Sequence, residues 1–335
     1  MMRKVILVLM AVLLMVGFVG CGKDAETTQS SPSTEPSPSQ EPEMTFEFTS
    51  SQGVNEMYQL TDTNQIMSYM IKTKNGKLIM LDGGYERNYK EIVALAKYLT
   101  GQAVPEIEAW FFSHSHGDHV NAFSELMLRQ QGLVTVNKIY HHFTSEEYVM
   151  KEENGNLKNF RQVHAAMKKC DPEGNKTVVV EQGDILNIDG VQIEVMLVPD
   201  EDANMIVSGV AINEASVIYR MTLDEQRVMF LGDAYQVAGK RLLDAWKDNM
   251  GAEIVQMAHH GSQGVQNAVY AAIAPKVCLW PTPQWLWDND PGTGYNTGGW
   301  ETITLHRYME HTLGVEHHYV AKDGLQQLVF PLDLD

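Results

Sequence analysis

The sequence predicts an α/β protein in which two packed β-sheets carry helices on their outer faces, a four-layer αββα sandwich. Strand-like and helix-like segments alternate from residue 65 to residue 330, and the strand-like segments gather in two blocks. Neither an internal repeat nor a second folded domain is evident in the sequence. Because each sheet must bury an apolar face against another layer, two blocks of strands with interspersed helices favour sheet-on-sheet packing with helices outside.

The first block contains short apolar runs that stop at turn-forming residues. Asn75-Gly76 separates two of these runs, and Asn-Gly tolerates the positive φ of tight hairpin turns. Apolar residues at helical spacing follow. We expect strands at residues 65–71, 78–81, 107–112 and 134–142, and helices at residues 89–99, 120–129 and 145–169.

The second block has shorter apolar runs that are split by Gly, Asp or Pro. Runs of this length with such boundaries are typical of strands. We expect strands at residues 177–180, 185–188, 191–198, 216–221, 227–231, 253–257, 277–280, 315–320 and 325–330. Helices are expected at residues 237–249, 265–273 and 302–312.

The first twenty residues are typical of an export signal. Arg3 and Lys4 precede an uncharged apolar run at residues 5–19, shorter than the roughly 20 residues that a spanning helix needs. The run ends in Gly20-Cys21 and resembles a bacterial lipoprotein signal, with Phe18 where leucine is usual. The resemblance implies a signal peptide at residues 1–20 and a lipid on Cys21, which would hold the protein on the outer face of the cell membrane. An ordinary signal peptide or a membrane anchor is the alternative.

Residues 21–43, which begin with this cysteine, predict a disordered tether. They are rich in Ser, Thr, Pro and Glu and contain no large apolar residue that could form a core. Residues 44–335 are therefore expected to form the folded domain.

The charge balance and the cysteines limit the partners and the environment. The formal net charge is −18, and removal of Arg3 and Lys4 with the signal would leave −20. Nucleic-acid binding depends on Lys and Arg that neutralise phosphates, so strong binding of nucleic acid is not expected. Cys170 and Cys278 could pair in an oxidising compartment or remain free thiols, and the sequence leaves both open.

Four candidate metal ligands fall within six residues, in the run His114-Ser115-His116-Gly117-Asp118-His119. Alternation along the preceding strand would turn the first two histidines to one side. The turn after the strand, made tight by the glycine, would bring the aspartate and the third histidine to a second point. Three imidazoles and a carboxylate suit zinc or a similar ion. The alternative is a run of surface histidines.

This run resembles the HxHxDH signature of the metallo-β-lactamase superfamily. Three further motifs follow the family order: they are Leu81-Asp82-Gly83-Gly84, Phe230-Leu231-Gly232-Asp233 and Ala258-His259-His260-Gly261-Ser262. The resemblance implies the αββα metallo-β-lactamase sandwich. The last two motifs resemble more specifically the branch that contains the extracellular domain of ComEC-type DNA-uptake proteins and bacterial phosphorylcholine esterases.

The resemblance implies two divalent metal ions in a shared site. The implied ligands are His114 and His116 for the first ion, Asp118, His119 and His260 for the second, and Asp233 as the bridge. His259 is the alternative to His260, and otherwise a proton donor or a substrate contact. Asp118 and Asp233 would also orient the attacking hydroxide, so we expect them to be catalytic together with His259. Asp82 would support the loop that carries the ligands.

One ligand of most family members is missing. They have another histidine before the bridging aspartate, whereas residues 171–258 contain none. Asn213-Glu214-Ala215-Ser216 stands there and resembles the Asn-x-x-Ser of the ComEC-like branch. Asn213 or water would then complete the first ion's ligands. Zinc is expected, and manganese is the alternative because oxygen ligands suit harder ions.

An aromatic segment follows the last ligand motif. After Trp280 it contains Trp285, Trp287, Tyr295 and Trp300, with prolines and glycines that predict a long loop. These rings could line a substrate pocket, by cation–π contact with a quaternary ammonium or by stacking on a sugar or base. Asp288 and Asp290 would favour a cationic group. The alternative is that the rings pack the loop onto the core.

The other histidines are expected to be structural. His141 and His142 end a predicted strand and could reach the same pocket, although a packed or surface pair is favoured. The remaining candidates lie on a predicted helix and strand near the C-terminus and are His306, His311, His317 and His318.

These features predict a metal-dependent hydrolase that acts outside the membrane on a phosphodiester or phosphorylcholine-type ester, as part of a small molecule or the cell envelope. The alternatives are a lactone, thioester or β-lactam hydrolase, an extracellular nuclease, and a non-catalytic binding lipoprotein. The missing histidine counts against the first alternative, because branches with that activity usually keep it. The acidic balance counts against a nuclease, and the intact ligand set counts against a non-catalytic binding lipoprotein.

Overall fold

The computed structural model describes residues 44–152, 156–202 and 210–334, and the predicted signal peptide, Cys21 and tether lie outside them. Met44–Asp335 form a unit separate from the residues that precede it. None of the helices in the described part is long and apolar enough to cross a bilayer.

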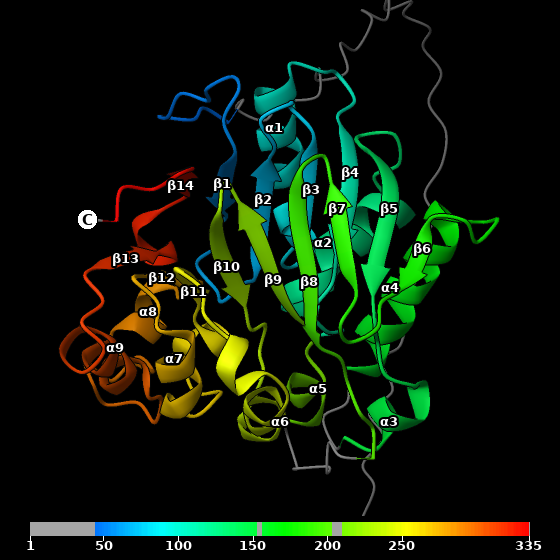
Figure 1. The fold of residues 1–335 in the computed structure, drawn as a ribbon. Coiled ribbons are helices and arrows are strands. Elements are labelled where there is room, and N and C mark those ends of the chain that lie inside the picture. Colours follow the sequence, from blue (N-terminus) through cyan, green and yellow to red (C-terminus); the bar gives the residue numbers. More distant parts are fainter. Residues whose placement is uncertain (1–43, 153–155, 203–209, 335) are drawn as a thin grey trace, which may run out of the picture. The chain divides into compact units, whose positions relative to one another are not determined.

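The strands of this unit form two mixed sheets, each with seven strands among the described residues. The first sheet has the order β14-β1-β2-β3-β4-β5-β6 and the second β13-β12-β11-β10-β9-β8-β7 (Figure 1). The strands of the first sheet are β1 (Glu56–Gln59), β2 (Ser68–Lys72), β3 (Leu78–Asp82), β4 (Glu106–Phe111), β5 (Thr135–His141), β6 (Thr177–Val179) and β14 (Gln326–Val329). Those of the second are β7 (Ile185–Ile188), β8 (Val191–Leu197), β9 (Ile218–Leu223), β10 (Gln226–Phe230), β11 (Ile254–Gln256), β12 (Val277–Trp280) and β13 (His317–Val320).

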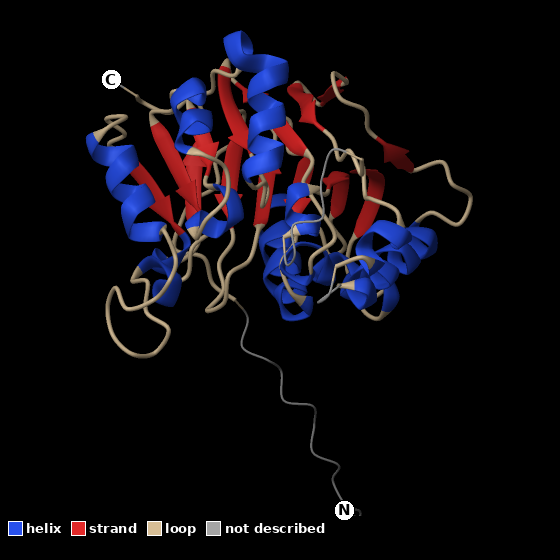
Figure 2. Ribbon diagram, turned by 90° about the horizontal axis from the view of Figure 1, so that it is seen from below, coloured by secondary structure: helices blue, strands red, loops and turns tan. Residues whose placement is uncertain are grey.

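Helices cover the outer face of each sheet (Figure 2). The first sheet packs on α1 (Tyr89–Thr100), α2 (Gly117–Leu128) and α4 (Leu157–Cys170), and the second on α6 (Gln236–Trp246), α7 (Asn267–Ile273) and α9 (Thr302–His311). Three short helices lie in connections: α3 (Glu146–Met150), α5 (Ala211–Glu214) and α8 (Gln284–Trp287).

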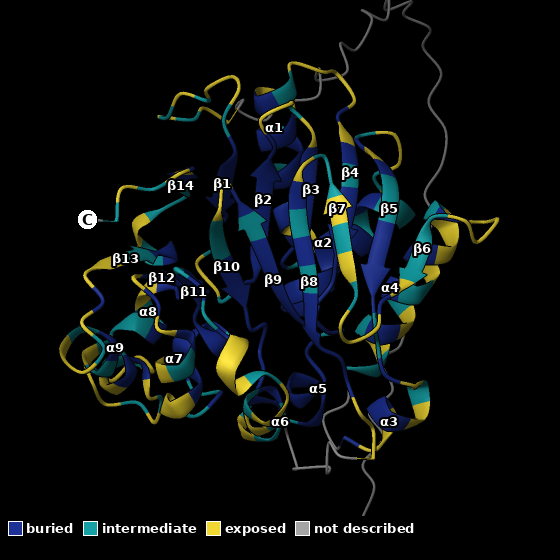
Figure 3. Cartoon of the chain, in the orientation of Figure 1, coloured by how far each residue is buried: buried dark blue, intermediate teal, exposed yellow. Residues whose placement is uncertain are grey.

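Three apolar clusters fill the spaces between these layers. One lies between the two sheets, where Phe111 and Tyr219 meet edge to face, and one lies under the helices of each sheet. The strands β2, β3, β11 and β12 inside the sheets are buried along their length, whereas β7 at the edge of its sheet alternates exposed and half-buried residues (Figure 3). The predicted αββα sandwich is confirmed.

The structure differs from the predicted elements where polar residues are buried or where helix formers are interrupted. β1 was not expected, because Glu56 is polar; its carboxylate is fully buried and pairs with Lys72 at 3.2 Å. The single helix predicted at residues 145–169 is wrong, since α3 ends at Met150 and α4 begins at Leu157. The weak helix formers Asn154-Gly155 stand between them in the sequence.

Candidate metal centre

The histidine run lies in the connection from β4 to α2. β4 ends at Phe111, so His114 and His116 follow the strand, and the prediction that strand alternation aligns them is wrong. His116 is the N-cap of α2, and Asp118 and His119 lie in the first turn of that helix. The helix begins three residues earlier than predicted, and its first turn fixes two of the candidate ligands.

Gly117 is required for close packing. A β-carbon at this position would lie 2.7 Å from Nδ2 of Asn121 and 2.9 Å from Nδ2 of Asn159, closer than real contacts allow. Its φ is not among the positive values of the chain, so the predicted role in a tight turn is wrong. The glycine lets α4 approach the start of α2.

Asp82 at the end of β3 anchors the connection. Its carboxylate accepts hydrogen bonds from the amide and hydroxyl of Ser113 at 2.9 and 2.6 Å, and it lies 2.8 Å from Nδ1 of His119. This contact leaves Nε2 of His119 as the atom that faces the other ligands. Asp82 belongs to none of the groups of residues that could hold an ion, so we assign it the role of supporting the ligand loop.

Asp233 lies at the centre of the histidines. Its Oδ2 is 3.3 Å from Nε2 of His119, 3.4 Å from that of His260 and 3.8 Å from that of His114. The backbone around it is fixed from two sides. The Asp233 amide donates to Oγ of Ser216 at 3.1 Å, and Oε1 of Gln256 accepts from the amide of Gly232 at 2.8 Å.

His260 belongs to the cluster and His259 borders it. His260 is fully buried, and its Nε2 is 3.3 Å from Oδ2 of Asp118. The His259 side chain is 21% exposed, and its Nε2 is 4.0 Å from Oδ2 of Asp233. Both residues have positive φ, 48° and 56°, which costs free energy in residues other than glycine and is common at functional sites. The preference for His260 as the ligand agrees with this placement.

The donor atoms fit metal binding. The buried ring nitrogens without a hydrogen-bond partner include Nε2 of His114, His116, His119 and His260. Oδ1 of Asp233 is also buried and unpartnered. Buried polar atoms are normally satisfied, so convergent unpartnered acceptors indicate an absent cation. Three groups of described residues have ligand atoms within 4.8 Å of one another. Two of them form this centre, His114, His116 and Asp233, and Asp118, His119 and His260; the third is His306, Glu310 and His318 and shares no residue with them.

The two groups differ in their proton affinity. Burial lowers the pKa of His114 far below its usual value and that of His116 to about 4. Burial also opposes protonation of His119 and His260, but nearby carboxylates outweigh it. Asp233 and Asp82 raise the pKa of His119, and Asp233 and Asp118 raise that of His260 to about 9.

A polar hollow of about 350 Å³ opens over these ligands. Its walls include Gln65, Tyr85, His116, Asp118, Asn121, Asn156, Asn159, Asn213, Asp233 and His259. Oδ1 of Asn213 is buried there without a partner, which suits its predicted place beside the first group. The asparagines of α2 and α4 and Tyr85 were not predicted to line the hollow. Asn121 stands one turn after Gly117 in α2, and that position is the sequence signal that could have found it.

The aromatic segment does not line this hollow. Trp287 packs on Trp280 and His306, with ring centroids 5.3 and 4.6 Å apart, as expected for rings that attach the loop to the core. Trp285 and Trp300 line a separate hollow, and Tyr295 another. The placement of these four rings therefore does not support their contact with a substrate held at the metal centre.

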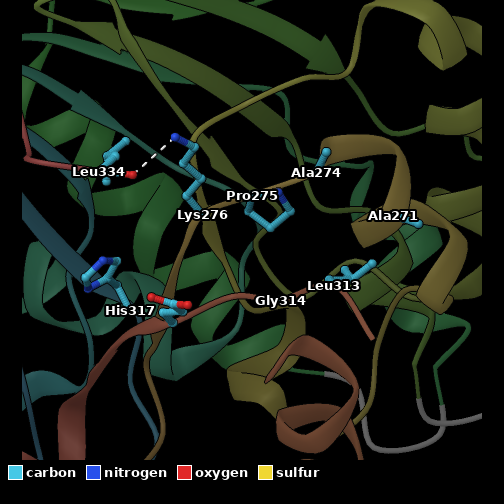
Figure 4. A pocket seen from close by; sticks show the side chains of 9 residues that line it. Ala271, Ala274, Pro275, Lys276, Leu313, Gly314, His317 and Leu334 are labelled. Carbon is cyan, nitrogen blue, oxygen red and sulfur yellow. Dashed lines mark hydrogen bonds between the residues drawn. The ribbon is translucent and has the colours of Figure 1, made fainter. Parts of the chain in front are cut away.

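The remaining candidates lie away from the centre. His141 is buried beside Phe143, and His318 accepts a hydrogen bond from the Trp280 indole at 2.9 Å. Cys170 and Cys278 are free thiols. A hollow of about 440 Å³ beside His317 contains none of the candidate ligands (Figure 4).

Comparisons with known proteins agree with this geometry. A family model described as "Metallo-beta-lactamase superfamily" matches residues 61–207. The structure of yeast PDE1 has 8% identity and a TM-score of 0.51, with 83% of this chain and 99% of that chain covered. No curated protein matches the sequence.

A second solved structure is that of CmlA, a diiron β-hydroxylase from Streptomyces venezuelae, with 10% identity and a TM-score of 0.50. The match covers 83% of this chain and 54% of CmlA, so this chain spans about half of that enzyme. At such identities these structures show a common fold. The chain therefore resembles the metallo-β-lactamase superfamily over residues 61–207 and shares the fold of these two structures, with two groups of candidate metal ligands in the site described above.

Proposed function

We propose that this chain is a binuclear metal-dependent hydrolase that cleaves a phosphodiester or a phosphorylcholine-type ester. The observation that carries the proposal is the position of Asp233, whose Oδ2 lies within 4 Å of Nε2 of three candidate ligands from both groups. A carboxylate so placed can serve two ions at once. We assign His114 and His116 to the first ion and Asp118, His119 and His260 to the second.

Each group of residues has a separate task. When bound, a pair of divalent ions, with zinc expected and manganese the alternative, activates water for in-line attack and offsets charge on the ester oxygens. Asp233 and Asp118 hold the geometry of the centre and orient the nucleophile. Asn213 contributes an amide oxygen beside the first group, where most relatives are expected to have a histidine.

His259 is placed to give a proton to the leaving oxygen. Its Nδ1 lies 2.9 Å from Oγ of Ser262, and that hydroxyl donates its own hydrogen to the His259 carbonyl at 2.8 Å. The hydroxyl therefore accepts from Nδ1–H, which leaves Nε2 to face the hollow. Burial lowers the pKa of His259, so its charged form releases a proton more readily than a free imidazolium does.

The walls of the hollow favour a substrate with little negative charge. Among the described residues that line it, none is Lys or Arg, and asparagine amides take their place. A dianionic phosphomonoester would have only the ions to neutralise it, whereas a diester with one negative charge needs less compensation. The resemblance of the last two motifs to the ComEC-like branch also supports a phosphate ester.

Hydrolysis of bis-p-nitrophenyl phosphate and p-nitrophenyl phosphorylcholine by the full chain, with added zinc or manganese, tests the proposal. Turnover should disappear with EDTA and in Asp233→Ala, and return when the ion is restored to the wild type. Asp248→Ala, which changes an exposed aspartate in the 3₁₀ turn Lys247–Asn249 after α6, is the control. Turnover that survives EDTA would contradict the proposal, and hydrolysis of a lactone or thioester instead would favour the alternative hydrolase.

We further propose that the enzyme is attached to the outer face of the membrane by a lipid on Cys21, which lies outside the described residues. Cys21→Ala should move the protein from the membrane fraction to the soluble or unprocessed fraction. An unchanged membrane fraction would indicate a different anchor.

A further inference from the structure

The loop between α8 and α9 is held in one conformation by a buried asparagine. Asn289 is 4% exposed and has a φ of 50°. Its Nδ2 donates to Oδ1 of Asn296 at 2.9 Å and to the Gly298 carbonyl at 3.2 Å, and its Oδ1 accepts from the Trp300 amide at 3.1 Å. A loop so ordered can present side chains with little loss of entropy on binding.

Two partly exposed tryptophans lie at the two ends of this loop, Trp285 in α8 and Trp300 just before α9. Trp285 and Trp300 meet edge to face, with centroids 5.0 Å apart, and both remain partly exposed. The six-membered ring of Trp300 lies against Gly298, where a β-carbon would be 2.6 Å from the ring. Since Trp280 and Trp287 already pack the segment onto the core, this pair has no comparable structural task.

The pair borders a hollow of about 660 Å³ that is separate from the hollow over the metal ligands. Asp288 lines it and accepts from Nε2 of Gln284 through Oδ2 at 2.7 Å. In the described part of the chain, no hydrogen bond engages Oδ1 of Asp288 or the indole N–H groups of Trp285 and Trp300. Asp290 and Gln284 also line the hollow, so its walls combine aromatic surface with two carboxylates, one amide and two indole donors.

We propose that this hollow is a saccharide-binding site, with β-linked hexose or hexosamine units as its ligand. Such rings carry equatorial hydroxyls and expose flat C–H faces, which pack on indole rings. Their hydroxyls can donate to Asp288 and accept from the indole N–H groups.

Asp288 and Asp290 both line the hollow and would attract a cation, but the size of the hollow and the geometry of the two rings favour a sugar. A quaternary ammonium is best held by several ring faces that surround it, whereas these two rings meet edge to face. The hollow also has room for more than one hexose ring. At its end the loop is fastened beside the metal centre, because the Glu301 amide donates to the Ser262 carbonyl at 2.6 Å.

Calorimetric titration of the full chain with cellotetraose and with N,N′,N″-triacetylchitotriose tests this site. At least one of them should bind, and Trp300→Ala and Trp285→Ala should each weaken binding about tenfold or more. Tyr295→Ala removes an exposed ring from the same loop that does not border this hollow, and it should bind like the wild type. Gly298→Ala, which displaces the Trp300 ring, should weaken binding while the thermal unfolding of the protein stays cooperative.

Binding should persist in Asp233→Ala, so failure of the proposed hydrolase activity and failure of the saccharide site are distinguishable. Absence of binding by both oligosaccharides would overturn the proposal. So would equal binding by Trp300→Ala and the wild type, or binding of tetramethylammonium in place of sugar.

Discussion

The two groups of candidate ligands contain the same residue types but hold their protons differently. Nε2 of His260 is 3.3 Å from Asp118 and 3.4 Å from Asp233, and both ring nitrogens of His119 face carboxylates. Nδ1 of His114, in contrast, lies 3.1 Å from the hydroxyl of Ser113. The imidazoles of the second group therefore attract protons in the absence of metal, whereas the imidazoles of the first group stay neutral beside the Asp233 carboxylate.

This difference shows that carboxylate placement decides the state of a buried imidazole. Burial alone disfavours the charged ring, as it does for His114 and His116. Carboxylates within hydrogen-bonding distance outweigh burial and raise the pKa of His119 and His260. A metal entering the second group must displace protons, whereas one entering the first group meets ligands that are ready to bind.

Removal of the residue common to both groups should have the largest effect. Asp233→Ala takes away the carboxylate that faces His114, His119 and His260. We expect loss of at least one ion per chain and a fall in kcat/KM of about a thousandfold or more. Elemental analysis and steady-state kinetics measure both. Retention of two ions with full turnover would show that the groups are independent of Asp233.

A histidine outside both groups should affect turnover and leave metal content unchanged. His259→Asn keeps a residue type that tolerates positive φ and removes the proposed proton donor. We expect kcat to fall about a hundredfold while the metal content stays that of the wild type. Loss of an ion in this variant would place His259 among the ligands and contradict the assignment to His260.

Loss of the carboxylate that contacts Nδ1 of His119 should weaken metal binding by the second group more than by the first. Asp82→Asn removes the charge that lies 2.8 Å from Nδ1 of His119. Loss of such support typically lowers metal affinity 10- to 100-fold. Competition with a chelating dye should show one weakened site and one near the wild-type affinity. Equal weakening of both sites would mean that Asp82 supports the whole connection.

The smallest expected effect is the pH dependence of affinity. Because the pKa of His260 is raised to about 9, its ring is charged at pH 7 without metal and must release a proton on binding. Affinity of the second group should therefore rise with pH up to about 9, by up to about tenfold per unit for each proton released. The first group, with His116 lowered to about 4, should change little above pH 5. Calorimetry in two buffers of different ionisation enthalpy counts the released protons.

The sequence was sufficient to find the candidate ligands, because metal chemistry restricts the residue types of the histidine run and because the later motifs resemble those of a known family. The histidine run, Gly232-Asp233 and His259-His260 could each be located without the structure. The residues that support Asp233 could not be located in this way. Ser216 accepts from the Asp233 amide and lies 17 residues before it, and Gln256 accepts from the Gly232 amide and lies 24 residues after it. Likewise, β1 was concealed by Glu56, whose charge is compensated only by its partner across the sheet.

Proximity along the chain was a poor guide to the walls of the site. Trp285 and Trp300 follow the last ligand motif closely in sequence but line another hollow. Asn159 and Asn213, which are remote in sequence, border the ligands because the start of α4 and the short helix α5 lie near the start of α2. Residues that only line a cavity can be of many types, so a single sequence gives no pattern by which to recognise them.

Metal content of the full chain at two pH values tests the central claim most directly. After equilibration with excess zinc and removal of free ions, elemental analysis should give two ions per chain at pH 8.5. At pH 5.5 the second group should be depleted first, because His119 and His260 then hold protons, and about one ion should remain. A single ion at both pH values, or loss of both ions together on acidification, would contradict the account of two groups with different proton affinity.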